Sequence, residues 1–130
     1  HLLYRALAQA IRRNLVASAQ SVSHGGLAYA LAKTALGGMM GIDISLENLP
    51  GSVSRDDYAL FSESQGRVLV TVDTKKQKQF EKIVGRIPHR FLGIVTEKPV
   101  ILINGIKGQS IVNTDVISLQ KAYTSRFADY

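Results

Sequence analysis

The chain of 130 residues contains no cysteine. Disulfide bonds, thiolate metal sites and thiol nucleophiles are therefore excluded, and the absence fits a reducing compartment. Long hydrophobic runs are missing as well, since stretches such as residues 100–103 are among the longest. A bilayer-spanning helix needs about 20 apolar residues, so we predict no transmembrane helix. The basic and then apolar pattern of a secretory signal peptide is also absent.

Catalytic and metal-binding motifs are equally scarce. His24 and His89 are the interior histidines, and neither has a second histidine at the helical spacing of a zinc site. The chain contains no nucleophile elbow and no phosphate-loop lysine motif. We therefore predict no catalytic residue and no metal ligand in this chain. The net charge of +6 is densest at residues 75–82, which we interpret as the solvated face of a helix, and we expect no nucleic-acid partner.

What the chain does contain is typical of a single soluble globular domain. Apolar residues make up 45% of the sequence and charged residues 20%. A chain of this length buries roughly two-thirds of the surface that its unfolded form exposes, which is enough for an ordinary core. We predict one domain over residues 1–130. Because His1 already lies within a helical pattern, we expect this domain to be a fragment of a longer protein.

Hydrophobic periodicity predicts alternating helices and strands. The expected helices cover about residues 3–15, 27–36, 75–84 and 114–127, and the expected strands cover about residues 16–22, 42–46, 68–72, 91–96 and 100–104. We expect a long loop at residues 47–57, glycines 37 and 38 to end the second helix in left-handed conformation, and Asp73 to cap the third. Neighbouring strands that can pair antiparallel predict a mixed β-sheet packed with helices, in the α+β class.

The first candidate ligand site is the strand-to-helix junction at residues 23–27. Ser23 precedes the pair Gly25 and Gly26, and a helix is expected to begin there. The free amides of a helix N-terminus, together with the helix dipole, favour a phosphate or a carboxylate. The same residues also suit a capped helix start with close packing between strand and helix, so both interpretations stay open.

The second candidate site is the polar segment at residues 62–66, immediately before a strong strand. It places the carboxylate of Glu63, the hydroxyl of Ser64 and the amide of Gln65 next to one another. Such a cluster can bind a sugar hydroxyl or an amide, or it can cap a turn.

Two segments carry a resemblance to a known family. Residues 18–32, which include Val22-Ser23-His24-Gly25-Gly26, resemble the Val-Ser-Asp-Gly-Gly-Leu-Ala pattern in the C-terminal domain of the aminoimidazole ribonucleotide synthetase-like superfamily. Residues 60–72 resemble the Leu-Phe-Ser-Glu-Ser-Gln-x-Arg strand entry of phosphoribosylformylglycinamidine synthase. The resemblance spans nearly the whole chain. It implies the α+β fold of that C-terminal domain, placed in the second half of a multidomain enzyme.

The resemblance also implies a function. In this synthase family, ATP phosphorylates the formyl amide oxygen of formylglycinamide ribonucleotide, and glutamine-derived ammonia displaces the phosphate to give the amidine in de novo purine biosynthesis. The implied cofactors of the full-length ligase are ATP and magnesium, and the implied location is the cytoplasm. The implied partners are the N-terminal subdomains of the same chain and a glutaminase. The ligand-binding positions that match are Ser23, Gly25, Gly26, Glu63, Ser64 and Gln65.

The sequence departs from the family at three positions. Gln20 and Ser21 replace a His-Asp pair, and His24 replaces an aspartate. In large relatives the first aspartate is a magnesium ligand, and a neutral serine hydroxyl is a poor replacement for it. We therefore expect no metal and no certain cofactor in this chain, and a supporting role for the domain.

Three further expectations follow. The isolated fragment should be inactive, because the N-terminal subdomains carry most catalytic positions in the family. Alternatives to the ligase domain are a non-catalytic structural module of that enzyme and a hydrogenase-maturation, HypE-like dehydratase domain, although the latter carries a C-terminal cysteine that is absent here. Apolar surface left by a missing subdomain would favour a homodimer of the fragment.

Overall fold

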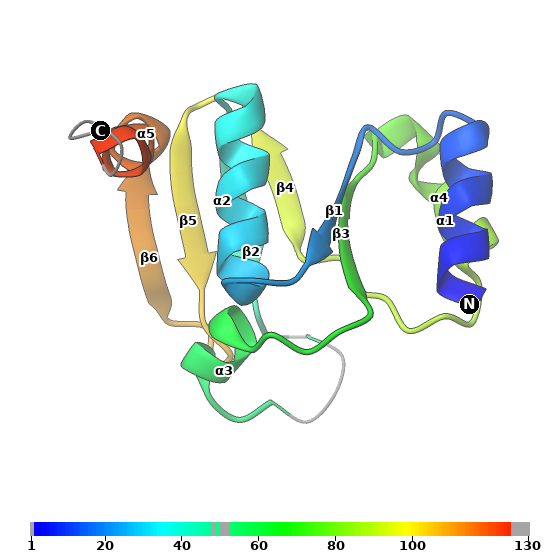
Figure 1. Ribbon diagram of the computed structural model, residues 1–130, viewed down its shortest axis with the longest axis horizontal. Coiled ribbons are helices and arrows are strands. Elements are labelled where there is room, and N and C mark those ends of the chain that lie inside the picture. The colour runs from blue at the N-terminus through cyan, green and yellow to red at the C-terminus, as the bar shows by residue number, and fades with distance from the viewer. Residues whose placement is uncertain (1, 48, 50–52, 126–130) are drawn as a thin grey trace.

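The computed structural model describes residues 2–47, 49 and 53–125. It contains short helices and strands that alternate along most of the chain (Figure 1). In chain order the elements are α1 (Leu2–Arg12), β1 (Ser18–Val22), α2 (Gly26–Gly38), β2 (Gly41–Ser45), α3 (Asp56–Phe61), β3 (Arg67–Thr71), the 3-10 helix η1 (Thr74–Lys76), α4 (Gln77–Val84), β4 (Gly93–Thr96), β5 (Val100–Asn104), β6 (Ser110–Asp115) and α5 (Val116–Ser125).

The strands form two separate sheets. The larger sheet has four strands in the order β4-β2-β5-β6, with β2 and β5 parallel and the other pairs antiparallel. The second is a two-stranded antiparallel ladder of β1 and β3. The prediction of an α+β fold with a mixed sheet is therefore confirmed, and the additional finding is that β1 and β3 stand apart from that sheet (Figure 1).

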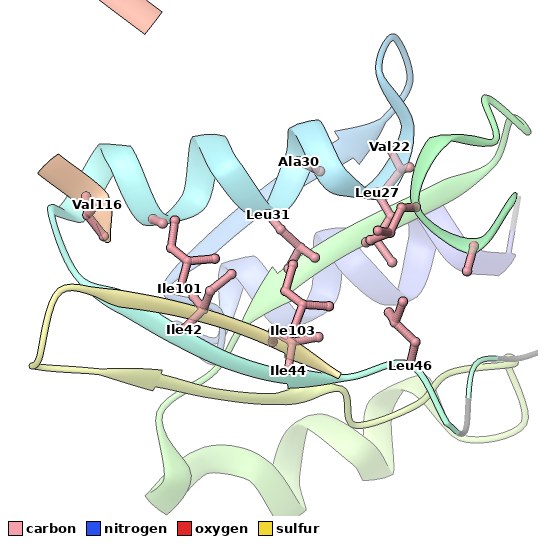
Figure 2. Packing of buried hydrophobic residues seen from close by; sticks show 13 residues of the cluster. Val22, Leu27, Ala30, Leu31, Ile42, Ile44, Leu46, Ile101, Ile103 and Val116 are labelled. Carbon is pink, nitrogen blue, oxygen red and sulfur yellow. The ribbon is translucent and has the colours of Figure 1, made fainter. Parts of the chain in front are cut away.

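The main core lies between α2 and the four-stranded sheet. β2 alternates as predicted and buries Ile42 and Ile44, while β5 buries Ile101 and Ile103 in the same way. The parallel register sets these isoleucines side by side, and Figure 2 shows them pointing toward α2. Full burial of one such side chain contributes about 1.5–3 kcal/mol. This core fixes the position of α2, whose first residues belong to the candidate site.

A second contact joins α1 to α4 beyond the two-stranded ladder (Figure 1). Ala6 and Ala10 of α1 and Val84 of α4 are buried there. Asp73 caps this region as predicted, since its carboxylate accepts a 2.9 Å hydrogen bond from the Lys75 backbone N–H. The first turn is the 3-10 helix η1, however, and α4 begins only at Gln77.

Two elements differ from the predicted pattern. The pattern predicts a loop over residues 47–57 and no strand between residues 104 and 114, but α3 begins at Asp56 and β6 covers residues 110–115. α3 has only six residues, too few to be stable alone, and a contact with a distant turn holds it. β6 is an edge strand with a register shift opposite β5, so its side chains lack a clear alternation. Residues 48, 50–52 and 126–127 of the predicted loop and last helix lie outside the described residues.

The end of α2 is also different from the prediction. Gly37 and Gly38 remain helical, and the residue in left-handed conformation is Met39, with φ of 50°. The Met39 backbone N–H donates to the carbonyl oxygens of Ala35 and Leu36. The prediction that a glycine makes this turn is therefore wrong, because hydrogen bonds to the last helical carbonyls hold a methionine in that conformation.

Candidate functional site

The two candidate segments lie at the same end of the β1–β3 ladder. Residues 23–26 leave β1 directly after Val22, and residues 62–66 lead directly into β3 at Arg67. In the antiparallel register Val22 pairs with Arg67. The end of one strand is therefore beside the start of the other, and two segments about forty positions apart in the sequence form one site.

A hydrogen bond joins the two segments. The backbone N–H of Gly25 donates to Oε1 of Glu63, with 2.9 Å between nitrogen and oxygen. Gly25 is the N-cap residue of α2 and has φ of 77°, a left-handed conformation that glycine adopts at little cost. A carboxylate near a helix N-terminus is favourable because the helix dipole and the free amides attract negative charge. The carboxylate that this helix start attracts is thus supplied by the chain itself.

Gly26 has a packing role. It is buried, its φ is 65°, and a Cβ atom placed on it would lie 2.6 Å from the Leu60 carbonyl oxygen and 2.8 Å from that of Ser62. Real Cβ atoms essentially never approach backbone atoms so closely. The first residue of α2 therefore packs against the end of α3, and Gly26 has little surface to offer a ligand.

The other predicted site residues are exposed. Ser23, Gly25, Glu63, Ser64 and Gln65 all face solvent. Within the segment, the hydroxyls of residues 62 and 64 share a hydrogen bond of 2.7 Å. The site is therefore an open polar surface beside the start of α2.

Two residues outside the predicted ligand-binding positions hold this surface in place: Arg67, the arginine of the strand-entry pattern, and Asp56, which no pattern singled out. The Arg67 guanidinium donates through Nη2 to the Ser62 carbonyl oxygen and through Nε, at 3.4 Å, to the Ser64 carbonyl oxygen. Asp56 accepts from the Ile106 backbone N–H at 2.7 Å and from Nε2 of Gln109 at 2.9 Å. The Asp56 contacts tie α3 to the turn between β5 and β6. Because residues 62–66 follow directly after α3, these contacts also fix where the polar segment begins. Two consecutive aspartates at residues 56–57 are the sequence signal that could have predicted this helix start, because acidic residues are favoured in the first turn of a helix.

The described ranges contain no group of three or more histidine, aspartate or glutamate side chains placed to hold a metal ion. His24 is exposed beside the site, and Nδ1 of His89 contacts the Ile87 carbonyl oxygen at 2.7 Å. None of the helices in the described part of the chain has the length and apolarity that a bilayer crossing demands.

Comparison with protein families places the chain. The family model described as "AIR synthase related protein, C-terminal domain" matches residues 1–103. The chain belongs to this family. The predicted resemblance to that superfamily is thereby confirmed, and the match covers both segments of the candidate site.

Individual relatives agree with the family. The chain is 38% identical, over 92% of its length, to the phosphoribosylformylglycinamidine synthase subunit PurL of Synechococcus sp. strain JA-3-3Ab. It is 32% identical, over 96% of its length, to the corresponding subunit of Methanocaldococcus jannaschii. In both cases it spans 16% of the relative's own length, so the relatives are far longer than this chain.

Solved structures share the fold. The structure of PurLQS from Thermotoga maritima matches with a TM-score of 0.80 and 24% sequence identity, over 91% of this chain and 21% of that one. T. maritima PurL complexed with FGAR matches with a TM-score of 0.79 and 23% identity, over 91% and 20%. At this identity the likeness shows the fold of the domain.

Proposed function

We propose that this domain belongs to an ATP-dependent ligase that converts formylglycinamide ribonucleotide to the amidine with glutamine-derived ammonia. The observation that carries the proposal is the match, along almost the whole chain, to subunits of phosphoribosylformylglycinamidine synthase. In such an enzyme the domain acts with N-terminal subdomains of the same chain and with a glutaminase. The whole enzyme uses ATP and magnesium and works in the cytoplasm. A homodimer of the isolated domain is a secondary expectation, which light scattering tests.

The candidate site favours the sugar of a ribonucleotide over its phosphate. Glu63 is exposed, and the Gly25 amide holds its carboxylate in place through Oε1. A carboxylate accepts hydrogen bonds from ribose hydroxyls, whereas a phosphate at the same helix start would be repelled by a second negative charge. Ser64 and Gln65 stand beside it and add a hydroxyl and an amide that can both donate and accept.

Calorimetric titration of the chain with formylglycinamide ribonucleotide tests this assignment. We expect Glu63→Ala to weaken binding by about tenfold, the loss of one hydrogen bond to a charged group. Glu97→Ala is the matched control, because Glu97 lies in the turn between β4 and β5, outside the candidate site. Equal binding by the wild type and Glu63→Ala would remove Glu63 from the site.

A purely structural module is the second candidate, and the Gly25–Glu63 contact favours it as well. The Gly25 N–H at the helix start already has a hydrogen-bond acceptor within the chain, so no ligand is needed to satisfy it, as expected for a scaffold. Titration with ADP and magnesium, and separately with the ribonucleotide, distinguishes the two. Millimolar or tighter binding of either that is weakened by Ser23→Ala or Glu63→Ala supports a ligand site, and absence of heat with both supports the scaffold.

The catalytic claim has its own test. The 130-residue chain, mixed with formylglycinamide ribonucleotide, ATP, magnesium and ammonia, should form no amidine. The same domain within a longer chain that includes the N-terminal subdomains should restore turnover. Amidine formation by the 130-residue chain alone would contradict the division of roles proposed here.

A further inference from the structure

Arg67 occupies the point where the two site segments leave the β1–β3 ladder. It is the first residue of β3 and pairs with Val22, the last residue of β1. Its side chain is half-buried and folds back over residues 62–64, away from the direction in which β3 runs. The guanidinium is therefore beside the site without belonging to its exposed surface.

The guanidinium binds the backbone on both sides of Glu63. Nη2 donates to the carbonyl oxygen of Ser62, and Nε donates at 3.4 Å to that of Ser64. Two carbonyl groups held by one rigid fork leave the residue between them little freedom. The Glu63 side chain, fixed at its backbone in this way, reaches the Gly25 N–H.

The Ser62 carbonyl group has a second neighbour. Its oxygen would lie 2.8 Å from a Cβ atom placed on Gly26, so it packs directly against the first residue of α2. A carbonyl in this position has little room to accept a water molecule from that side. A hydrogen bond from Arg67 therefore satisfies this carbonyl group at a point of close packing.

We propose that Arg67 is the positioning residue of the candidate site. It sets the path of residues 62–64 so that Glu63 meets the Gly25 amide, and its effect on a ligand acts through Glu63. The effect of Arg67 on ligand binding (the ligand step) rests on the proposed function. Its effect on the position of Glu63 (the positioning step) does not. A lysine at this position has the charge but lacks the planar fork with its fixed donor directions, so Arg67→Lys should hold the two carbonyl groups less firmly.

Hydrogen–deuterium exchange of the Gly25 amide in the 130-residue chain, followed by NMR, tests the positioning step. We expect roughly tenfold faster exchange in Arg67→Met, as one charge-assisted hydrogen bond is released, and a smaller increase in Arg67→Lys. The Ile44 amide, in β2 of the main core, should exchange as in the wild type in both variants. Arg13→Met is the control, because it removes the same charge from an exposed position just after α1.

The outcomes decide separately on the two steps. Unchanged Gly25 exchange in a folded Arg67→Met or Arg67→Lys variant overturns the positioning role, and the lysine variant decides the question if the methionine variant does not fold. Faster Gly25 exchange without ribonucleotide binding by the wild type supports the positioning role and contradicts only the proposed ribonucleotide site. Where the wild type binds ribonucleotide, we expect Arg67→Met to bind it less tightly than Arg13→Met, and equal affinity would overturn the ligand step.

Discussion

Two packing contacts within the described residues, that of α2 on the four-stranded sheet and that of α1 on α4, are closed to very different degrees. α2 packs on the four-stranded sheet through isoleucines that are all less than 10% exposed, and Leu46 and Val116 complete the core at 1% and 0%. α1 packs against α4, yet Leu2, Tyr4 and Ile11 of α1 remain 74%, 58% and 51% exposed. An open groove of about 620 Å³ runs between α1 and residues 83–88.

This difference shows which contact supports the candidate site. The closed core holds α2, and the start of α2 holds the Glu63 carboxylate. The α1–α4 contact lies beyond the ladder and leaves apolar surface in solvent, so its share of the stability should be smaller (Figure 1). A change in the closed region, or at the site it supports, should therefore affect stability more than a matched change elsewhere.

The largest contrast should come from truncating one side chain in each region. Ile103→Ala, in the closed core, should lower the free energy of unfolding by about 2–5 kcal/mol, because buried methyl groups are lost and a cavity is left. Ile83→Ala, in the half-buried wall of the groove, should cost about 1 kcal/mol, because less surface is lost and the site is open. Urea unfolding measures both, and equal losses would show that the two regions are equally closed.

A pair of glycines sharpens the comparison within α2. Gly26→Ala should destabilise the fold by about 2–4 kcal/mol, because it adds left-handed strain and an overlap with backbone atoms at the end of α3. Gly37→Ala should stabilise by up to about 1 kcal/mol, since Gly37 is helical and an added methyl group would meet nothing within 4 Å. Thermal unfolding of both variants checks the sign, and a stable Gly26→Ala protein would contradict the close approach of α2 to α3.

Removal of the Glu63 carboxylate should have a moderate effect. Glu63→Ala should lower the free energy of unfolding by about 0.5–1.5 kcal/mol, because an exposed charge-assisted hydrogen bond at a helix start is lost. The matched change Glu97→Ala removes the same charge from the turn between β4 and β5. The two variants should differ in chemical denaturation, and identical midpoints would show that the contact adds no stability.

The smallest effect should be a dependence of stability on pH at the start of α5. Hydrogen bonds from the backbone and side chain of Ser118, at 2.6 and 3.0 Å, lower the pKa of the Asp115 carboxyl below its ordinary value of 3.8. A pKa that is lower in the folded state gives stability that is present above the unfolded value and is lost as the pH falls through the folded value. Asp115→Asn should therefore flatten the dependence of the free energy of unfolding on pH below about pH 4, which urea unfolding at several pH values measures. An unchanged pH dependence in this variant would contradict the prediction.

The strongly patterned parts of the fold follow from the sequence. Alternation at residues 42–46 predicts β2 and its buried face, and the helical stripe of apolar residues after Gly26 predicts α2. Both follow from the sequence because each pattern places its apolar side chains on the one face that packs into the core. α3 and β6 do not follow from the sequence. α3 depends on the bond between Asp56 and the distant Ile106 amide, and no local pattern contains that contact.

The candidate site shows the same division. The residues at 23–26 and 62–65 can be selected from the sequence as two polar segments. Their meeting depends on the register that pairs Val22 with Arg67, and local chemistry does not set that register. For the same reason, the sequence alone suggests that the Gly25 amide is available to bind an anion from outside the chain. In the folded chain this amide donates to the Glu63 carboxylate.

The central claim is that these two segments form one site through Gly25 and Glu63. A nuclear Overhauser experiment on the 130-residue chain tests it most directly, because the Gly25 nitrogen and the Glu63 Oε1 lie 2.9 Å apart. We predict a cross-peak between the Gly25 amide proton and the γ-protons of Glu63, and its loss in Arg67→Met. A well-resolved Gly25 amide with no contact to Glu63 in the wild-type chain would contradict the account.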